Sequence, residues 1–150
     1  MSKEHINIKN RKARFQYEIH ETLVAGIKLL GTEIKSIREA KVSLVESYCY
    51  FQNDEMWVKS LHIGEYSHGN INNHEPLRER KLLLHKKEIK KWQEKVERGG
   101  NMTVVPLRLF INDQGFAKIE LGLASGKKTH DKRDSIKDRD IKRDMERQLK

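Results

Sequence analysis

Seven histidines are the side chains of this sequence best suited to binding a metal ion or moving a proton. Three of them, His62, His68 and His74, follow one another at intervals of six residues. A metal site is usually marked by a closer pair of histidines together with carboxylates or thiolates. The spacing therefore favours histidines in a solvated loop, and we expect no metal ion and no other cofactor.

Residues 122–128 (GLASGKK) are similar to a phosphate-binding loop. The Walker motif needs four residues between its glycines and a Ser or Thr after its lysine. Here three residues separate Gly122 from Gly126, and Lys128 follows Lys127. No helix is predicted to begin there and direct its N–H groups at a phosphate. We therefore expect a flexible basic hinge rather than a nucleotide site.

Nucleophiles and acid–base pairs give no catalytic signal either. The single cysteine, Cys49, lies in a predicted strand without a neighbouring cation to lower its pKa, so we expect it in the core. The serines lack a GxSxG context, and the acidic residues form no spaced pair. We expect no catalytic residue and no enzymatic activity.

Cationic residues carry the functional signal. The 150-residue chain has 31 Lys and Arg against 22 Asp and Glu, a net charge of +9, which suits nucleic acid before a membrane. The cations cluster at residues 9–14 (KNRKAR), at Lys35 and Arg38, at residues 78–81 (RERK), and at Lys127 and Lys128. These clusters fall at the ends of predicted elements, where a barrel presents its binding loops. The pattern predicts an RNA- or DNA-binding protein with strongly salt-dependent affinity.

Alternating apolar residues predict the strands that would position these cations. The alternation covers residues 15–29, 105–111 and 117–123, while residues 43–52 are rich in β formers and residues 56–63 are predicted as the strand that returns from the following turn. Asn53 and Asp54 form one predicted turn and residues 112–115 another, each joining a hairpin. Pro106 cannot donate to a sheet, so its strand is expected to be an edge or to carry a bulge. Residues 64–76 have the composition of a loop.

Two stretches have helical periodicity. A short helix is predicted around Ile34 and Ile37, with Thr32 as its N-cap. Residues 85–98 predict the clearest helix, because its apolar residues share one face and two glycines follow it. Several strands around one core, with a helix inserted between them, predict a small OB-fold-like β-barrel with two to three α-helices.

The chain divides into residues 1–125, the predicted barrel, and residues 126–150, a basic tail without any Phe, Trp or Tyr. The tail is too polar to offset the entropy of ordering, so we expect it to be disordered when free and to fold on a partner. Ile141, Met145 and Leu149 would share one stripe of a helix. No apolar run is long enough to span a membrane, and one cysteine fits a cytoplasmic location.

Seven short stretches, in order, resemble the SmpB family of SsrA-binding proteins. They are residues 10–14 (NRKAR), 25–26 (AG), 30–38 (LGTEIKSIR), 80–85 (RKLLLH), 105–107 (VPL), 120–124 (ELGLA) and 126–133 (GKKTHDKR). The resemblance covers about residues 6–150. The sequence departs from the family pattern at Val24, where an acid is frequent, and at Gln16, where His is frequent.

The resemblance implies an OB-like barrel that binds the tRNA-like domain of transfer-messenger RNA (tmRNA) in trans-translation. It implies delivery of this alanine-charged RNA to stalled 70S ribosomes, with the tail folding as a helix in the empty mRNA channel near the decoding centre. Elongation factor Tu and alanyl-tRNA synthetase would be partners through the RNA. The residues expected to bind RNA, from the clusters and the resemblance, are Asn10, Arg11, Lys12, Arg14, Lys35, Arg38, Arg80, Lys81, Leu83, His85, Lys127 and Lys128.

The tail residues expected to meet the ribosome are Asp131, Lys132, Arg133, Lys137, Arg139, Ile141, Lys142, Arg143 and Leu149. Two alternatives stay open. One is another ribosome- or RNA-binding OB-fold protein, similar to an initiation factor. The other is a small nuclease or RNA-modifying enzyme on the same scaffold, which would need a carboxylate or histidine constellation.

Overall fold

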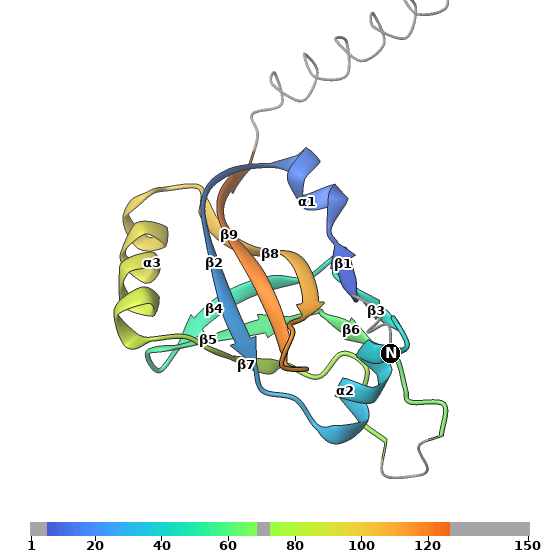
Figure 1. The fold of residues 1–150 in the computed structure, drawn as a ribbon. Helices are drawn as coiled ribbons and strands as arrows, with labels where there is room; N and C mark the ends of the chain where they lie inside the picture. The colour runs from blue at the N-terminus through green and yellow to red at the C-terminus, as the bar shows by residue number, and fades with distance from the viewer. Residues whose placement is uncertain (1–5, 69–72, 127–150) are drawn as a thin grey trace, which may run out of the picture.

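The computed structural model describes residues 6–68 and 73–126 (Figure 1). All expectations for Lys127, Lys128 and the rest of the tail lie outside these ranges. The described chain is mainly β, as predicted, and its long strands wrap into a barrel with helices at its periphery (Figure 1).

Six of the described strands close the barrel through antiparallel pairs. In barrel order they are β2 (Tyr17–Ile27), β9 (Ala117–Gly126), β8 (Met102–Ile111), β4 (Tyr48–Gln52), β5 (Glu55–Lys59) and β7 (Arg80–Leu83), which pairs with β2 again. The long β2–β9–β8 ladder forms the stiff side. The β4–β8 seam is short, with Cys49 opposite Val104. Strand β1 (Asn7–Lys9) pairs with β8, and β3 (Val42–Ser43) pairs with β6 (His62–Ile63) in a second sheet.

Strand β2 confirms the odd-numbered apolar phase. Ala25 and Ile27 are buried, whereas Thr22 and Val24 are exposed, as expected when one face of a strand packs on a core. The predicted start of this strand is wrong, because Phe15 lies in a helix, α1 (Arg11–Gln16). The Oδ1 of Asn10 accepts a hydrogen bond from the Ala13 N–H and caps this helix.

Other predicted strands are interrupted or bent where the backbone must turn. The run 43–52 splits into β3 and β4, because Ser47 donates from both its N–H and its hydroxyl to the Leu44 carbonyl. The run 56–63 splits into β5 and β6 at Ser60, whose φ is 62°. Asn53 and Asp54 do join β4 to β5, with φ of 53° and 62°, as a two-residue hairpin requires.

Pro106 lies at a bulge of β8, since the register with β9 shifts between Pro106 and Arg108. The strand is not an edge, because β8 pairs with β9 on one side and with β1 and β4 on the other. The predicted hairpin at residues 112–115 is confirmed, with Ile111 opposite Ala117.

Both helices that the periodicity indicated are present. The N-cap of α2 (Gly31–Arg38) is Leu30 rather than Thr32, and the Leu30 N–H donates to Glu33 Oε1 over 2.8 Å. Helix α3 (Lys86–Arg98) packs Ile89 and Trp92 against the barrel. It stops at Gly99, where a Cβ would lie 2.5 Å from the Cγ of Met102.

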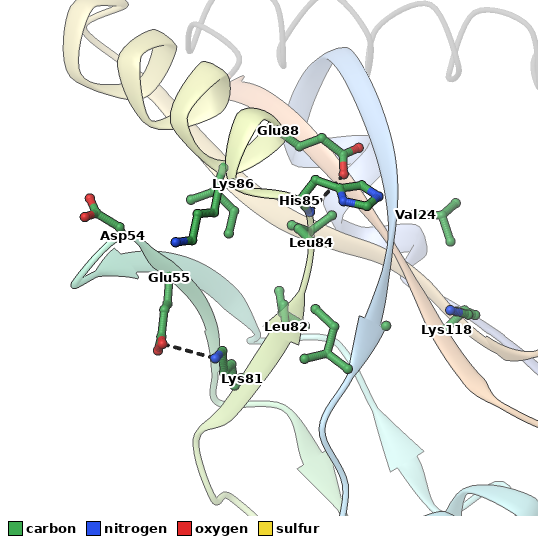
Figure 2. A pocket seen from close by; sticks show the side chains of 13 residues that line it. Val24, Asp54, Glu55, Lys81, Leu82, Leu84, His85, Lys86, Glu88 and Lys118 are labelled. Atoms are coloured by element: carbon green, nitrogen blue, oxygen red, sulfur yellow. Dashed lines mark hydrogen bonds and ion pairs between the residues drawn. The ribbon is translucent and has the colours of Figure 1, made fainter.

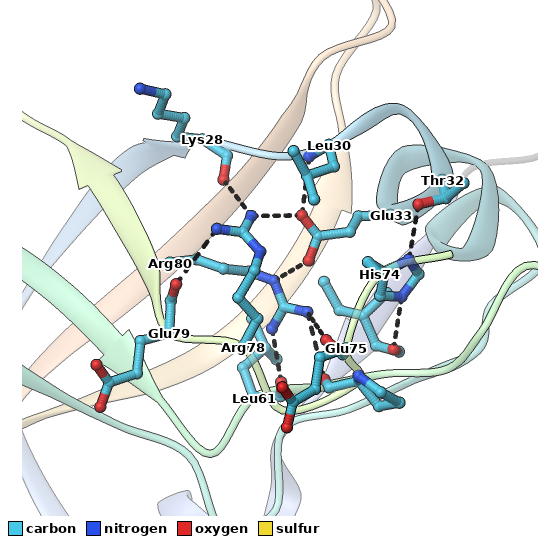
Figure 3. A network of polar contacts seen from close by, with 12 residues as sticks. Lys28, Leu30, Thr32, Glu33, Leu61, His74, Glu75, Arg78, Glu79 and Arg80 are labelled. Carbon is cyan, nitrogen blue, oxygen red and sulfur yellow. Dashed lines mark hydrogen bonds and ion pairs between the residues drawn. The ribbon is translucent and has the colours of Figure 1, made fainter. Parts of the chain in front are cut away.

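A buried charge network holds α2 against the start of β7 (Figure 3). Glu33 and Arg80 are fully buried and paired, Arg78 also donates to Glu33, and Arg80 Nη1 donates to the Leu61 carbonyl over 2.8 Å. Burial by itself would raise the pKa of Glu33, but the Arg78 and Leu30 hydrogen bonds and the Arg80 charge outweigh it and lower that pKa. The network therefore sets where β7 begins.

His74 belongs to the same region, so its assignment as a solvated loop histidine is wrong. Its ring is 4% exposed, with Nε2 donating to the Ile63 carbonyl and Nδ1 bonded to the Thr32 hydroxyl, both at 2.9 Å. His74 therefore ties α2 to β6, while His62 and His68 are exposed as expected.

Candidate nucleic-acid interface

A groove of about 510 Å³ opens where β7 runs into α3 (Figure 2). Its walls come from β7 and α3, from β2, from the β4–β5 turn and from β9. Thirteen residues line it: Val24, Gly26, Asp54, Glu55, Lys81, Leu82, Leu83, Leu84, His85, Lys86, Glu88, Ile89 and Lys118. Three of the residues expected to bind RNA, Lys81, Leu83 and His85, therefore lie together.

Strand alternation exposes an apolar edge along this groove. Arg80 and Leu82 point inward on β7, so Lys81 and Leu83 point outward. Leu83 is 52% exposed and lies opposite Gly26, where a Cβ would come within 3.3 Å of the Leu83 Cβ. Val24, on the same outer face of β2, is 51% exposed. Adjacent large aliphatic side chains in water mark a surface that binds a partner.

The charges that line the groove balance, because Lys81, Lys86 and Lys118 face Asp54, Glu55 and Glu88. Lys81 Nζ lies 3.0 Å from Glu55 Oε1. His85 is the N-cap of α3, where its backbone N–H donates to Glu88 Oε1 over 3.1 Å, and the residue is exposed. Binding inside the groove would therefore depend on shape and apolar contact. An excess of positive charge must come from residues around the groove.

Three exposed lysines that the sequence analysis did not select, Lys87, Lys90 and Lys91, lie outside the groove lining and continue the positive charge of Lys86 along α3. Lys86, Lys87, Lys90 and Lys91 recur on α3 at two helical turns, and none forms an ion pair with another described residue. Lys86 and Lys87 occupy the first turn, where positive charge opposes the helix dipole. Their positions therefore cost helix stability, which favours a role in binding an anion. The signal was visible as KKEIKK, but periodicity assigned it only to a helix.

The structure places the N-terminal cluster elsewhere, on α1, at the end of β2 that is distant from the groove (Figure 1). Arg11, Lys12 and Arg14 are exposed there. Lys12 pairs with Glu46 at 2.8 Å and Arg14 with Glu120 at 3.4 Å. The Lys12–Glu46 pair is solvent-exposed and therefore weak, and the Arg14 side chain is exposed although Glu120 is largely buried, so both cations remain available to a polyanion.

Two residues of the predicted set do not present their side chains. Arg80 is fully buried against Glu33, and Asn10 is 2% exposed, with its Nδ2 donating to the carbonyls of Leu44 and Pro106. Both side chains are held by partners within the protein. Lys35 and Arg38 are exposed on α2, and Lys35 Nζ lies 5.5 Å from the ring centroid of Tyr66.

The residue types that bind metals do not cluster in the described ranges. These ranges contain no group of three or more His, Cys, Asp or Glu that could hold a metal ion. Cys49 is 6% exposed, and burial raises the pKa of its thiol, which confirms it as a core residue. No described helix has the length and apolar content needed to cross a bilayer.

The barrel and its groove, flanked by exposed lysines, define a class: small β-barrel proteins with a nucleic-acid-binding type of surface. The family model for SmpB protein matches residues 7–150, and the chain belongs to this family. It is 56% identical to an "SsrA-binding protein" of Phocaeicola vulgatus over 145 residues, 97% of this chain and 96% of that one. A second "SsrA-binding protein", of Bacteroides thetaiotaomicron, is 54% identical over 150 residues, 100% and 99% of the two chains.

A solved structure has the same fold. One of its chains aligns with a TM-score of 0.70 and 45% identity over 83% of this chain and 86% of that chain, in a structure described as "tmRNA-SmpB: a journey to the center of the bacterial ribosome". The two chains therefore share the fold over most of their lengths.

Proposed function

We propose that this protein binds the tRNA-like domain of tmRNA and brings the RNA to stalled ribosomes in trans-translation, as a cytoplasmic adaptor without enzymatic activity. The observation that carries the proposal is the pair of exposed side chains Leu83 and Val24 in the lining of a groove that also contains Lys86, the first residue of the lysine-rich helix α3. The 45% identity to a chain of the structure described as tmRNA–SmpB in the ribosome supports it. Lysines bind phosphates, while apolar edges and His85 contact bases and sugars.

The chain would divide this work between two parts. The barrel would hold the RNA, and the tail of residues 126–150 would probe the mRNA channel. Asp131, Lys132 and Arg133 near the start of the tail would position it. A helix of residues 131–150 would be about 30 Å long at 1.5 Å per residue. An mRNA in the channel would sterically exclude this helix. The protein would therefore act only on ribosomes whose mRNA channel is empty. Elongation factor Tu and alanyl-tRNA synthetase would be partners through the RNA.

Leu83 and Leu77 offer a matched test, because their side chains are 52% and 54% exposed and only Leu83 lines the groove. We expect Leu83→Ala to weaken binding of the tRNA-like domain about tenfold, near 1.4 kcal/mol, while Leu77→Ala binds as wild type. Affinity is measured by titration at several salt concentrations, with a random duplex RNA of equal length as competitor.

The wild-type protein must first prefer the tRNA-like domain to that duplex. Equal affinity for both RNAs would contradict the proposed function, as would turnover of labelled RNA by the purified protein. Tight binding to vacant ribosomes without any tmRNA would instead indicate a factor of the initiation type.

A further inference from the structure

A second cleft, of about 400 Å³, lies beside the groove and shares Gly26, Leu83 and Lys118 with it. Its remaining lining comes from the connection between β2 and α2 and from the β8–β9 hairpin: Ile27, Leu29, Leu30, Gly31, Ile34, Gly115, Phe116 and Ala117. The only charged side chain in the lining is that of Lys118. The cleft is thus an apolar extension of the candidate interface, with one cation at the common border.

Phe116 forms one wall and is 65% exposed, the largest exposed fraction among the large hydrophobic residues of the described ranges. The hairpin beneath it is firmly built. Asn112 Oδ1 accepts the N–H groups of Gln114 and Phe116, and the Asn112 N–H donates to the Phe116 carbonyl over 2.9 Å. Gly115 supplies the positive φ of 87° that the turn requires. The ring is therefore presented to solvent by a fixed backbone.

The opposite wall is equally well supported. Leu30 is 50% exposed, although its backbone is held at the start of α2 by the bond to Glu33. Ile34, one helical turn further on, packs against the core, and Leu83 continues the apolar wall towards the groove. An aromatic face on one side and aliphatic side chains on the other suit a flat apolar ligand.

We propose that this cleft takes an unpaired nucleobase of the bound RNA, stacked on Phe116, with a neighbouring phosphate on Lys118. The proposal rests on the proposed function and adds a base-binding subsite to it. Unpaired bases of folded RNA commonly stack on exposed aromatic rings, and a nucleotide combines an apolar plane with an anion. The cleft offers the same two features, an apolar slot and a single cation, and it continues the groove.

Phe116→Ala tests the stacking contact. We expect it to weaken binding of the tRNA-like domain at least tenfold and to leave the melting temperature unchanged, because the ring is mostly in solvent. Since no cation is lost, the slope of log affinity against log salt should stay that of wild type. Lys118→Ala should instead reduce the slope by about 0.7 to 0.9, the loss of one phosphate contact. Leu77→Ala is the control, an exposed aliphatic residue outside both cavities.

Phe116→Trp gives a second, direct readout. It should bind the RNA as wild type, and its additional indole emission should be quenched when the RNA is added, beyond any change of Trp57 and Trp92 in the wild-type protein. If Phe116→Ala binds the RNA as wild type and the new indole is not quenched, the subsite is wrong while the proposed function stands. If wild type shows no preference for the tRNA-like domain, the proposed function fails first. Unchanged RNA affinity of Phe116→Ala would overturn the base-binding subsite and would leave an apolar protein segment as the alternative occupant of the cleft.

Discussion

Arg80 and Lys81 are adjacent cations with opposite roles. The alternation of β7 turns the Arg80 guanidinium into the protein against Glu33 and turns the Lys81 ammonium outward to the groove. The buried pair compensates its loss of hydration only while both charges and their hydrogen bonds are present. Arg80 therefore serves the site indirectly, by fixing where the outward-facing residues of β7 stand.

Replacing Glu33 with Gln should destabilise the fold strongly. The amide leaves Arg80 as a buried charge without a counter-ion, and breaking such a pair costs about 3–5 kcal/mol. Urea unfolding of Glu33→Gln at neutral pH measures this loss. A control is Glu46→Gln, whose partner Lys12 is exposed, and which should cost less than about 1 kcal/mol. Equal, small losses for both variants would contradict a structural role for the network.

The same carboxyl predicts a pH dependence. Because the folded protein lowers the pKa of Glu33, the ionised form contributes stability above the ordinary pKa of a glutamate, about 4.3. That contribution is lost as the pH falls below this value and through the lowered pKa. Urea midpoints of wild type should therefore fall between about pH 5 and pH 3, and those of Glu33→Gln should fall less steeply.

Sequence periodicity predicted the longer elements and missed the shortest ones. Strands β2, β8 and β9 and helix α3 repeat their pattern several times, so the pattern outweighs local exceptions. Strand β1, strand β7 and helix α1 have three, four and six residues, and none repeats its pattern more than twice. Their structure comes from partners distant in sequence, such as the Asn10 bonds to Leu44 and Pro106.

The candidate site follows the same logic. Leu83 and His85 were found through the family resemblance, since spacing alone gives no reason to select an exposed leucine. The burial of Arg80 could not be seen in RERK, because its partner Glu33 lies 47 residues earlier. The α3 lysines were visible as charges, and only the structure shows that the first of them, Lys86, lines a groove.

Helix α3 supports a test in which stability and binding move in opposite directions. The double variant Lys86→Ala, Lys87→Ala removes two positive charges from the first turn, so stability should rise by about 0.3–1 kcal/mol per residue. Affinity for the tRNA-like domain should fall, and the salt slope should decrease by about 0.7 to 0.9 for each lost phosphate contact. Lys41→Ala, an exposed lysine away from both cavities, is the control.

Unchanged affinity and an unchanged salt slope in the double variant would show that these lysines are only solvated. A loss of both stability and affinity would instead point to damage to the α3 fold, which circular dichroism would reveal.

The barrel is closed by one long three-stranded ladder and by two short strand pairings. The β2–β9–β8 ladder pairs along most of its length, whereas β4 meets β8 near Cys49 and β7 meets β2 at Gly26 and Ile27. The prediction of a small barrel is confirmed, and closure takes six strands instead of the five of the OB type, because β7 inserts between β5 and β2. Both cavities and their walls lie within residues 24–118.

Removal of residues 127–150 should consequently separate two activities. Affinity for the tRNA-like domain should stay within about tenfold of wild type, or roughly 1.4 kcal/mol, because every residue lining the cavities is retained. Tagging of nascent chains on ribosomes stalled on truncated mRNAs should be abolished in a reconstituted translation assay. Lys132→Ala combined with Arg133→Ala should behave like the truncation, and a larger loss of affinity would make the segment an RNA-binding arm.

Strand β9 begins beside the cavities, with Lys118 on their border, and ends at Gly126. Eight residue steps of about 3.3 Å separate these two positions, a span of about 26 Å along a ladder paired on both sides. Strand β9 thus fixes the distance between a ligand bound at Lys118 and a partner that contacts the chain after Gly126. Inserting two residues into β9, with matching insertions in the neighbouring strands, would increase this distance without reversing which side chains face inward. Both binding positions would be retained, and only the spacing between them would change.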